Sequence, residues 1–325
     1  GVAAAIVAAG GKVADFNKRA PKAAAPKGVE KVTTDVLVVG GGAGGLAAAV
    51  RAATQGAHVI LIEKRPNIGG ATQLNAGTLV ATGSRYQREV MKETKDSPEL
   101  LAKDIFRAGE NKNDPVLVKM VGEKAGGVVD WLIYDLKIPY GPAATQYPDH
   151  SANRQLGVTG RSVNWLKLMS QKLNENGGKI MTDTRAQEFI RDKAGNVVGV
   201  KATMTNGQKI DFSAKSVVLA SGGYGANLAM LPKKVASYLF YGRDSETGDG
   251  LAMGKKIGAG TINLDLVKQY PQGVETLPHH ALAATASSTD TMKKSGAIYV
   301  NRDGKRIVDE LAGLGTLTKI TEAQK

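Results

Sequence analysis

The sequence contains no cysteine among its 325 residues. Within these residues, this excludes disulfide bonds, thiolate metal sites, covalent c-type haem attachment and a cysteine nucleophile. The lack of thiols also fits an exported protein, because free cysteines pair readily in oxidising compartments. No apolar run reaches the roughly 18 residues that a membrane-spanning helix needs, and no internal repeat is visible. The sequence therefore predicts no membrane span and no metal site.

The amino-terminal segment lacks the basic residues that precede the apolar core of a signal peptide. It begins with Gly1 rather than methionine, and residues 2–9 are small and apolar, so we do not assign them as a signal peptide. Residues 17–34 contain two prolines and several lysines, which is typical of a linker. We expect residues 1–34 to be a linker and the tail of a preceding module.

The overall composition favours a globular α/β protein. The chain has 40 glycines, 42% hydrophobic residues and 22% charged residues, and its length allows roughly two domains. The formal net charge is +13, but the lysines are scattered, often beside acids, without a basic helix face or an aromatic stacking motif. We therefore expect no nucleic-acid partner, and interpret the charge as a diffuse field that attracts anionic substrates.

Residues 36–63 are the most informative segment. They combine a hydrophobic run, a glycine turn, an alanine-rich helix pattern, a second hydrophobic run and a terminal acid, Glu63. Gly40, Gly42 and Gly45 fill a G-x-G-x-x-G frame, which allows a tight turn, close approach of a pyrophosphate to a helix N-terminus, and close packing of helix on strand. The segment predicts a dinucleotide-binding unit in which the acid binds ribose hydroxyls. An ordinary glycine-rich turn is the alternative.

A second glycine pair follows the ribose-binding acid. Gly69 and Gly70 precede the hydroxyl residue Thr72, and together they allow backbone amides to approach a pyrophosphate and the edge of an isoalloxazine ring. A nicotinamide-binding domain has no need for this second pair, so the pattern favours FAD over NAD. A surface turn is the alternative.

Three helices are expected after this region. Pro98 and Pro115 each follow a capping residue and so mark helix starts, and residues 163–175 have helical spacing. Leu132 and Leu136 are expected on a core-facing surface.

The strand signals fall into two groups. Residues 179–182 are expected to begin a small scaffold sheet, and residues 196–203 and 208–212 flank an Asn206-Gly207 hairpin turn. Residues 216–227 form a hydrophobic run that ends in glycines. We expect this run to rejoin the nucleotide-binding sheet as a parallel strand whose carboxyl end faces the ligand crevice.

Between residues 34 and 311, six motifs occur in a fixed order. They are the G-x-G-x-x-G frame, Glu63-Lys64, Gly69-Gly70-Ala71-Thr72, Ala220-Ser221-Gly222-Gly223-Tyr224-Gly225-Ala226-Asn227, Thr247-Gly248-Asp249-Gly250-Leu251 and Gly296-Ala297-Ile298-Tyr299-Val300-Asn301-Arg302-Asp303-Gly304-Lys305-Arg306. In this combination the sequence resembles the flavoprotein family of fumarate reductases and succinate dehydrogenases. The resemblance is strongest to the soluble flavocytochrome-type branch of fumarate, urocanate and acrylate reductases.

The resemblance implies an α/β fold: a Rossmann-like FAD-binding domain with a parallel sheet at residues 35–275, and the beginning of an inserted α+β capping domain at residues 276–325. Relatives continue beyond this point, so we expect the native chain to continue too. The residues expected to contact FAD are Gly40, Gly42, Ala43, Gly45, Glu63, Lys64, Gly69, Gly70, Ala71, Thr72, Ala76, Gly77, Ala186, Ala220, Gly222, Gly223, Thr247 and Asp249.

The activity implied by the resemblance is hydride transfer from flavin N5 to the C=C bond of an α,β-unsaturated carboxylate of urocanate, fumarate or acrylate type. Quinol-linked members attach FAD to a histidine, which residues 70–74 lack, so the FAD is expected to be non-covalent. The implied electron donor is an upstream haem or FMN module or a membrane quinol-linked partner. The implied location is the periplasm, in anaerobic respiration, with the cytoplasm as the alternative.

Two other function classes stay open. One is a family relative that works in the oxidative direction, such as an amino-acid oxidase or a ketosteroid dehydrogenase. The other is a non-catalytic flavin- or RNA-binding protein, which the positive charge would fit.

On the substrate side the sequence departs from the family pattern. Tyr270-Pro271 stands where fumarate reductases have a His-Pro pair, and tyrosine donates a hydrogen bond without charge, as in the urocanate reductase branch. A buried core tyrosine is the alternative. Asp290 and Lys293 occupy the positions of an acid and a base in the family's proton relay, with an exposed i, i+3 pair as the alternative. We expect Tyr270, Asp290 and Lys293 to be catalytic.

The family's proton-donating arginine has no counterpart in this sequence. Leu314 stands at that position, eight residues beyond Arg306. We expect Arg306 to brace the hairpin around residues 301–304 and not to replace the missing arginine. The substrate site is therefore expected to be incomplete within these residues.

Overall fold

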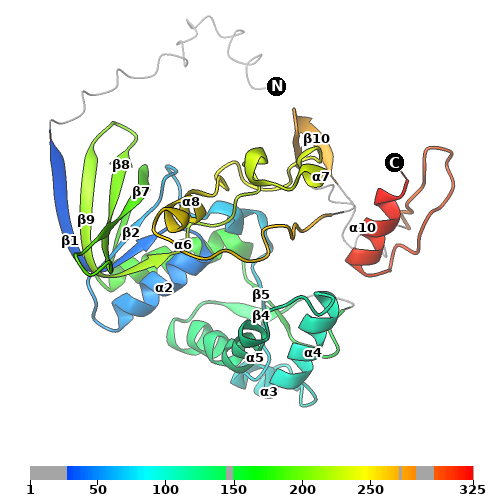
Figure 1. Cartoon of the computed structure of the whole chain (residues 1–325). Coiled ribbons are helices and arrows are strands. Elements are labelled where there is room, and N and C mark those ends of the chain that lie inside the picture. The colour runs from blue at the N-terminus through cyan, green and yellow to red at the C-terminus, as the bar shows by residue number, and fades with distance from the viewer. Residues whose placement is uncertain (1–27, 144–148, 271–272, 283–295, 325) are drawn as a thin grey trace, which may run out of the picture.

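The computed structural model describes residues 28–143, 149–270, 273–282 and 296–324. Its centre is a six-stranded sheet in the order β6-β2-β1-β9-β8-β7 (Figure 1). The first four strands in this order run parallel, and β8 and β7 join antiparallel to their neighbours. The strands are β1 (Val29–Val39), β2 (Val59–Ile62), β6 (Lys179–Met181), β7 (Thr184–Arg191), β8 (Val197–Met204) and β9 (Lys209–Leu219).

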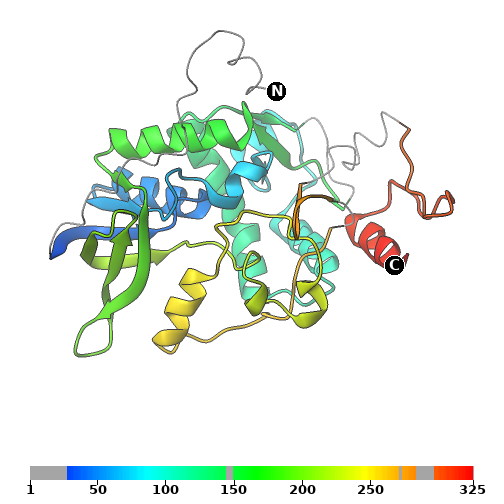
Figure 2. The same cartoon turned by 90° about the horizontal axis from the view of Figure 1, so that it is seen from above.

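The sheet has an apolar cluster on each face, because side chains alternate along β1. Val38 packs with α2 (Ala43–Thr54) and α6 (Arg161–Glu175). Leu37 and Val39 point the other way and pack with Phe212 and with Met253 of α8 (Asp249–Lys256). Figure 2 places α6 and α8 on opposite sides of the strands. This confirms the predicted α/β class with a parallel sheet.

The structure confirms some strand predictions and corrects two. Val36 to Val39 pair in parallel with Ser216 to Leu219, so the run at residues 216–227 does rejoin the sheet, and the Asn206-Gly207 hairpin forms between β8 and β9. However, residues 208–212 and 216–219 are not separate strands. They belong to one continuous strand, β9. Phe212 and Ala214 are both buried, so the alternation of buried and exposed side chains continues into the polar residues that separate the two predicted runs.

The prediction that residues 179–182 begin a separate small sheet is wrong. β6 instead pairs with β2 at the edge of the main sheet, from Ile60 opposite Lys179 to Ile62 opposite Met181. The open edge of β2 offers unpaired backbone groups, and β6 pairs with them in parallel.

A second group of elements lies below the sheet in Figure 1. It contains α3 (Arg85–Glu89), α4 (Pro98–Ala108), α5 (Pro115–Asp130) and a π-helical turn (Trp131–Asp135), with the small sheet β3-β5-β4 (Thr78–Val80, Gln155–Val158, Tyr140–Pro142). The predicted helix starts are confirmed: Ser97 Oγ accepts from the Leu100 amide at 3.1 Å, and Asp114 Oδ1 accepts from the Val116 amide at 2.8 Å. Leu132 and Leu136 are buried in the core, as expected.

A buried ionic cluster ties this group together. The Arg154 side chain is fully buried just before β5, and its guanidinium donates to Asp96 Oδ1 at 2.6 Å and to Asp104 Oδ2 at 2.5 Å. Asp96 also accepts from Thr82 and Gln87, each at 2.7 Å. The cluster therefore links α4 to the small sheet through hydrogen-bonded charges.

The remaining elements follow the main sheet. They are the short helical turns η2 (Gly70–Leu74), η4 (Leu228–Met230) and α7 (Lys233–Ala236), the hairpin of β10 (Val274–Leu277) and β11 (His280–Leu282), and α10 (Leu314–Glu322). Among the described helices, none combines the length and apolarity needed to cross a lipid bilayer. The expected boundaries at residues 34 and 275 stay predictions.

Candidate cofactor site

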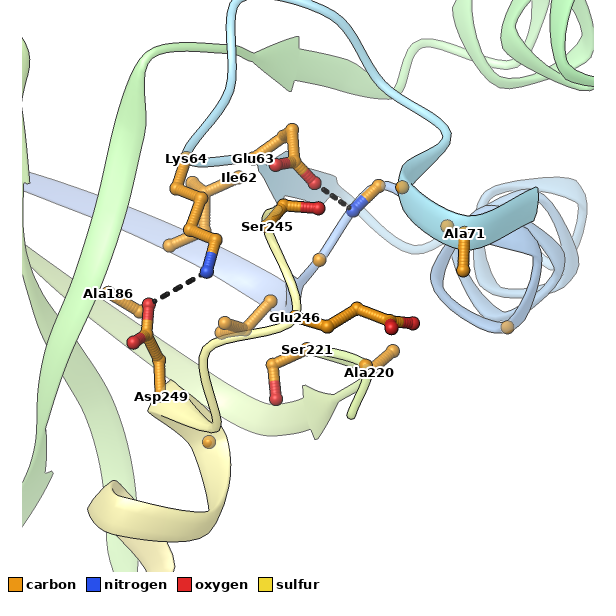
Figure 3. Close-up of a pocket in the computed structure, with 18 of the residues that line it drawn as sticks. Ile62, Glu63, Lys64, Ala71, Ala186, Ala220, Ser221, Ser245, Glu246 and Asp249 are labelled. Atoms are coloured by element: carbon orange, nitrogen blue, oxygen red, sulfur yellow. Dashed lines mark hydrogen bonds and ion pairs between the residues drawn. The ribbon is translucent and has the colours of Figure 1, made fainter. Parts of the chain in front are cut away.

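The carboxyl ends of three parallel strands open into one pocket (Figure 3). Residues 40–44 follow β1, residues 63–64 follow β2, and residues 220–222 follow β9, and all of them line it. In α/β sheets, ligands bind outside the carboxyl ends of parallel strands. The sheet topology therefore assembles the three predicted glycine and acid motifs at one place.

The glycine turn after β1 depends on the absence of side chains. Gly40 has φ +110°, and a Cβ there would lie 2.3 Å from the Ala220 carbonyl oxygen; at Gly45 it would lie 1.9 Å from the Gly40 carbonyl oxygen. Gly42, the N-cap residue of α2, makes no side-chain cap, and the first turn of the helix holds no acid. Apart from the Ala43 amide, which donates to Thr72 Oγ1, the N-terminal amides of this helix are therefore available to an anion such as a pyrophosphate.

The Glu63 carboxylate is held in a fixed orientation at the pocket. This group is buried, and Oε2 accepts from the Gly41 amide at 2.8 Å while Oε1 accepts from the Arg65 amide at 2.9 Å. Each carboxylate oxygen keeps a further lone pair for a ribose hydroxyl. The two backbone bonds orient the carboxylate before any ligand arrives.

The second glycine pair is fastened to the first turn. The Gly69 amide donates to the Gly41 carbonyl at 2.8 Å, and the Ala43 amide donates to Thr72 Oγ1 at 3.0 Å. Gly69 and Gly70 both have positive φ, at +120° and +47°. The two glycine segments thus form one cradle of backbone around the pocket.

A cationic group marks another part of the pocket. Lys64 Nζ donates to Asp249 Oδ2 at 3.1 Å and to Thr247 Oγ1 at 2.7 Å, and Arg185 pairs with Asp249 Oδ1 at 2.8 Å. Burial raises the pKa of Asp249, but hydrogen bonds from Arg185, Thr247 and Lys64 outweigh it and lower the pKa below its usual value. Asp249 therefore stays ionised and fixes both cations.

Most of the residues expected to contact FAD line this pocket. They are Gly40, Gly42, Ala43, Glu63, Lys64, Gly69, Gly70, Ala71, Thr72, Ala186, Ala220, Gly222 and Asp249. The others, Gly45, Ala76, Gly77, Gly223 and Thr247, do not line it. Gly45 packs α2 on the turn, the Gly223 carbonyl accepts from the Gly248 amide at 3.1 Å, and Thr247 accepts from Lys64. Ala76 and Gly77 precede β3.

The sequence did not predict some of the lining residues. Arg185, Ser245, Glu246 and Met253 all face the pocket. Arg185 stands in β7 with no motif around it, so only the fold reveals its role. Glu246 directly precedes the Thr-Gly-Asp-Gly motif, and that position was the one available signal.

A second hollow adjoins the first. We call it the aromatic hollow; it is walled by Tyr238, Phe240, Tyr241 and Tyr270, with α10 on one side, and Glu246 lines both it and the cofactor pocket. The Tyr241 and Tyr270 rings meet edge to face at 5.5 Å between centroids.

Tyr270 itself is 40% exposed, so it is not a buried core tyrosine. Lys268 Nζ lies 5.0 Å from the centroid of its ring. The hollow therefore combines flat aromatic walls with a cation beside Tyr270.

The other substrate-side residues are only partly visible. Asp290 and Lys293 lie outside the described residues, and the backbone of Leu314 begins α10. Arg306 Nε donates to Glu310 Oε1 at 3.2 Å, and the same oxygen accepts from the Tyr299 amide at 2.9 Å. Arg306 thus braces the hairpin, as expected.

Comparisons with known proteins agree with this geometry. Residues 35–325 match the FAD binding domain family. The chain is 34% identical to a urocanate reductase of Eggerthella lenta over 320 residues, which is 95% of this chain and 51% of the relative. It is 31% identical to a cytochrome-type fumarate reductase of Shewanella frigidimarina over 288 residues, which is 86% of this chain and 48% of the relative.

The fold also matches a solved structure of a flavoprotein reductase. The open conformation of a flavocytochrome c3 fumarate reductase matches with a TM-score of 0.76 and 28% identity, over 89% of this chain and 50% of the other. The chain therefore spans about half the length of these relatives. Because the family match covers residues 35–325 and the backbone cradle suits a dinucleotide, the chain belongs to the FAD binding domain family.

Proposed function

We propose that this chain is the flavin-binding part of an FAD-dependent reductase that reduces the C=C bond of an α,β-unsaturated carboxylate. The observation that carries the proposal is the aromatic hollow, which adjoins the FAD pocket and shares Glu246 with it. Relatives named urocanate reductase, fumarate reductase and NADH:acrylate oxidoreductase support it, at 34%, 31% and 27% identity.

The pocket residues hold and orient the cofactor. Reduced FAD supplies the hydride when it is bound. The amides of α2 bind the pyrophosphate, Glu63 binds ribose, and the backbone of residues 69–72 approaches the flavin. Residues 70–74 contain no histidine, so we propose that the FAD is bound without a covalent link.

The aromatic hollow favours an acrylate that carries a ring. Tyr241 and Tyr270 offer flat, uncharged surfaces against which a ring packs, and Lys268 offers one cation for one carboxylate. A dicarboxylate would bring a second charge to a wall of tyrosines, where it gains no ionic partner. Urocanate- and cinnamate-type acids are thus proposed as better substrates than fumarate.

The electron donor is also proposed by analogy with relatives. Cytochrome-type fumarate reductase is the printed name of one relative, so a haem or FMN module, or a membrane quinol-linked partner, is the proposed donor. Because this chain has no cysteine, a haem module would carry its own haem-attachment residues. Periplasmic anaerobic respiration is the proposed setting.

The test follows the colour of the flavin. In the native protein that contains this chain, the flavin is reduced without oxygen, and urocanate, cinnamate, fumarate and methacrylate are added separately while the oxidised absorbance is recorded. We expect urocanate or cinnamate to reoxidise the flavin at least about tenfold faster than fumarate, the ratio that about 1.4 kcal/mol produces.

Two outcomes would contradict this proposal. If none of the four acids reoxidises the flavin while oxygen does so rapidly with peroxide release, the chain belongs to an oxidase. If fumarate reacts fastest, the reductase assignment survives but the role of the tyrosine wall is wrong.

Glu63→Gln tests the ribose contact. The amide that replaces the carboxylate has one donor group, which faces either the Gly41 or the Arg65 amide and leaves that N–H without its acceptor. The ribose hydroxyls also lose their charged acceptor, and because a hydrogen bond to a charged group contributes about 1.5–3 kcal/mol, we expect the dissociation constant for FAD to rise by about 10- to 100-fold. Fluorescence titration measures it. Glu188→Gln, on the exposed face of β7, is the control and should bind FAD normally.

A further inference from the structure

The charges that line the FAD pocket do not balance. Five charged side chains face it: Lys64, Arg185, Glu63, Asp249 and Glu246. There are thus two cations and three carboxyl groups, before the cofactor adds its own anionic diphosphate. If every carboxyl were ionised, the pocket would carry one uncompensated negative charge against an anionic ligand.

Glu246 is the acid that lacks compensation. Asp249 pairs with Lys64 and Arg185, and Glu63 accepts from two backbone amides. Across the described residues, the Glu246 carboxyl has neither an ion pair nor a hydrogen bond, while its backbone carbonyl accepts from the Ala226 amide at 2.9 Å. In Figure 3 its side chain extends towards Ala71 and away from Lys64 and Asp249.

The groups around Glu246 offer no alternative partner. The aromatic hollow that it lines also contains Tyr238, Tyr241, Tyr270, Lys268 and Glu322, and Arg243 precedes it on its own loop. None of these pairs with its carboxyl in the described structure. Burial is the one cause that shifts the pKa of Glu246, and it raises that pKa. Burial therefore shifts this side chain towards its neutral form relative to an exposed glutamate.

We propose that Glu246 is an FAD-binding residue that enters the complex as the neutral acid, taking up one proton from solvent as the cofactor binds. Its carboxyl O–H is then a donor for an acceptor atom on the cofactor, whereas the ionised group would only accept and repel. This property belongs to cofactor binding and holds for any substrate the enzyme reduces.

The proposal fixes the sign of a pH effect. Binding raises the pKa of Glu246 above its value in the free chain, so FAD affinity is full below the free-chain pKa. Affinity falls as pH rises through the interval between the two pKa values, by up to about tenfold per pH unit, and then levels off.

The experiment is calorimetric titration of FAD into the flavin-stripped chain, from about pH 6 to about pH 9, in two buffers with different ionisation enthalpies. The difference in apparent heat between the buffers gives the number of protons taken up. We expect a maximum of about one proton per FAD. In Glu246→Gln we expect no uptake and an affinity that stays constant with pH, because the amide is a neutral donor of similar size.

The control lies two residues away. Asp244→Asn removes an acid from the same loop that pairs with Arg65 and does not line the pocket, so it should keep the proton uptake. Thermal melting of each variant checks folding, and the unmodified chain alone already answers the question. Absence of uptake in the unmodified chain, or equal uptake in Glu246→Gln, would overturn the proposal.

Discussion

Gly45→Ala is expected to remove FAD binding and to destabilise the fold by about 3 kcal/mol or more, at the upper end of the cost of overpacking. The added Cβ would lie 1.9 Å from the Gly40 carbonyl oxygen and 3.3 Å from Val38 Cγ1. The nearest obstacle is backbone, which cannot rotate away as a side chain would. α2 must therefore move off β1 and open the turn whose amides are proposed to bind the pyrophosphate.

The measurements are the flavin absorbance of the purified protein and its melting temperature without flavin. For a domain of this size, 3 kcal/mol corresponds to a fall of about 6 °C or more. Gly44→Ala is the control on the same helix turn, because its Cβ would meet no atom within 4 Å. Since alanine favours helix over glycine by about 1 kcal/mol, this variant should melt at the same temperature or higher without flavin. Equal melting temperatures for the two variants would contradict the packing argument.

The FAD pocket could largely be predicted from the sequence, because most of its motifs lie in one short segment. The segment from β1 to β2 is local, so its spacing alone places Gly40, Gly45 and Glu63 at one strand edge. Gly69 adds to it because the chain returns to the same turn within a few residues. When the residues of a site are this close in the sequence, local structure alone determines how they lie.

The rest of the site could not be predicted in this way, because it is assembled over long distances in the chain. Arg185 reaches the pocket because β7 returns beside α8, where it meets Asp249. The aromatic hollow joins Tyr238 to Glu322, whose side chains lie 2.5 Å apart although the residues are far apart in sequence. Neither contact has a spacing that a sequence pattern could reveal. The error at β6 has the same origin, because its partner β2 lies more than a hundred residues earlier.

Arg154→Leu tests the ionic cluster that links α4 to the small sheet β3-β5-β4. It should lower the free energy of unfolding by an amount comparable to that expected for Gly45→Ala. The guanidinium is fully buried between Asp96 and Asp104, so its removal leaves the buried Asp96 carboxylate without its cation, while Asp104 keeps only its ion pair with the exposed Arg107. Breaking a buried ion pair by removing one partner costs about 3–5 kcal/mol. Urea unfolding at pH 7 measures this loss. Arg107→Leu is the matched control, because Arg107 pairs with the same Asp104 at 2.8 Å but is 58% exposed, and it should cost less than about 1 kcal/mol.

The same pair of variants carries a pH signature. In the unmodified chain, burial raises the pKa of Asp96 and Asp104, but hydrogen bonds that include those from Arg154 outweigh burial and lower both pKa values. Their stabilising contribution is therefore present above the unfolded pKa of about 3.9 and is lost as the pH falls below it. In Arg154→Leu the lowering contribution of the guanidinium is lost, so the pKa values of both carboxyls rise relative to those in the unmodified chain. The stability difference between the two proteins should thus narrow as the pH falls towards the unfolded pKa of about 3.9 and below it, and a constant difference would show that the lost stability comes from packing and not from unpaired charge.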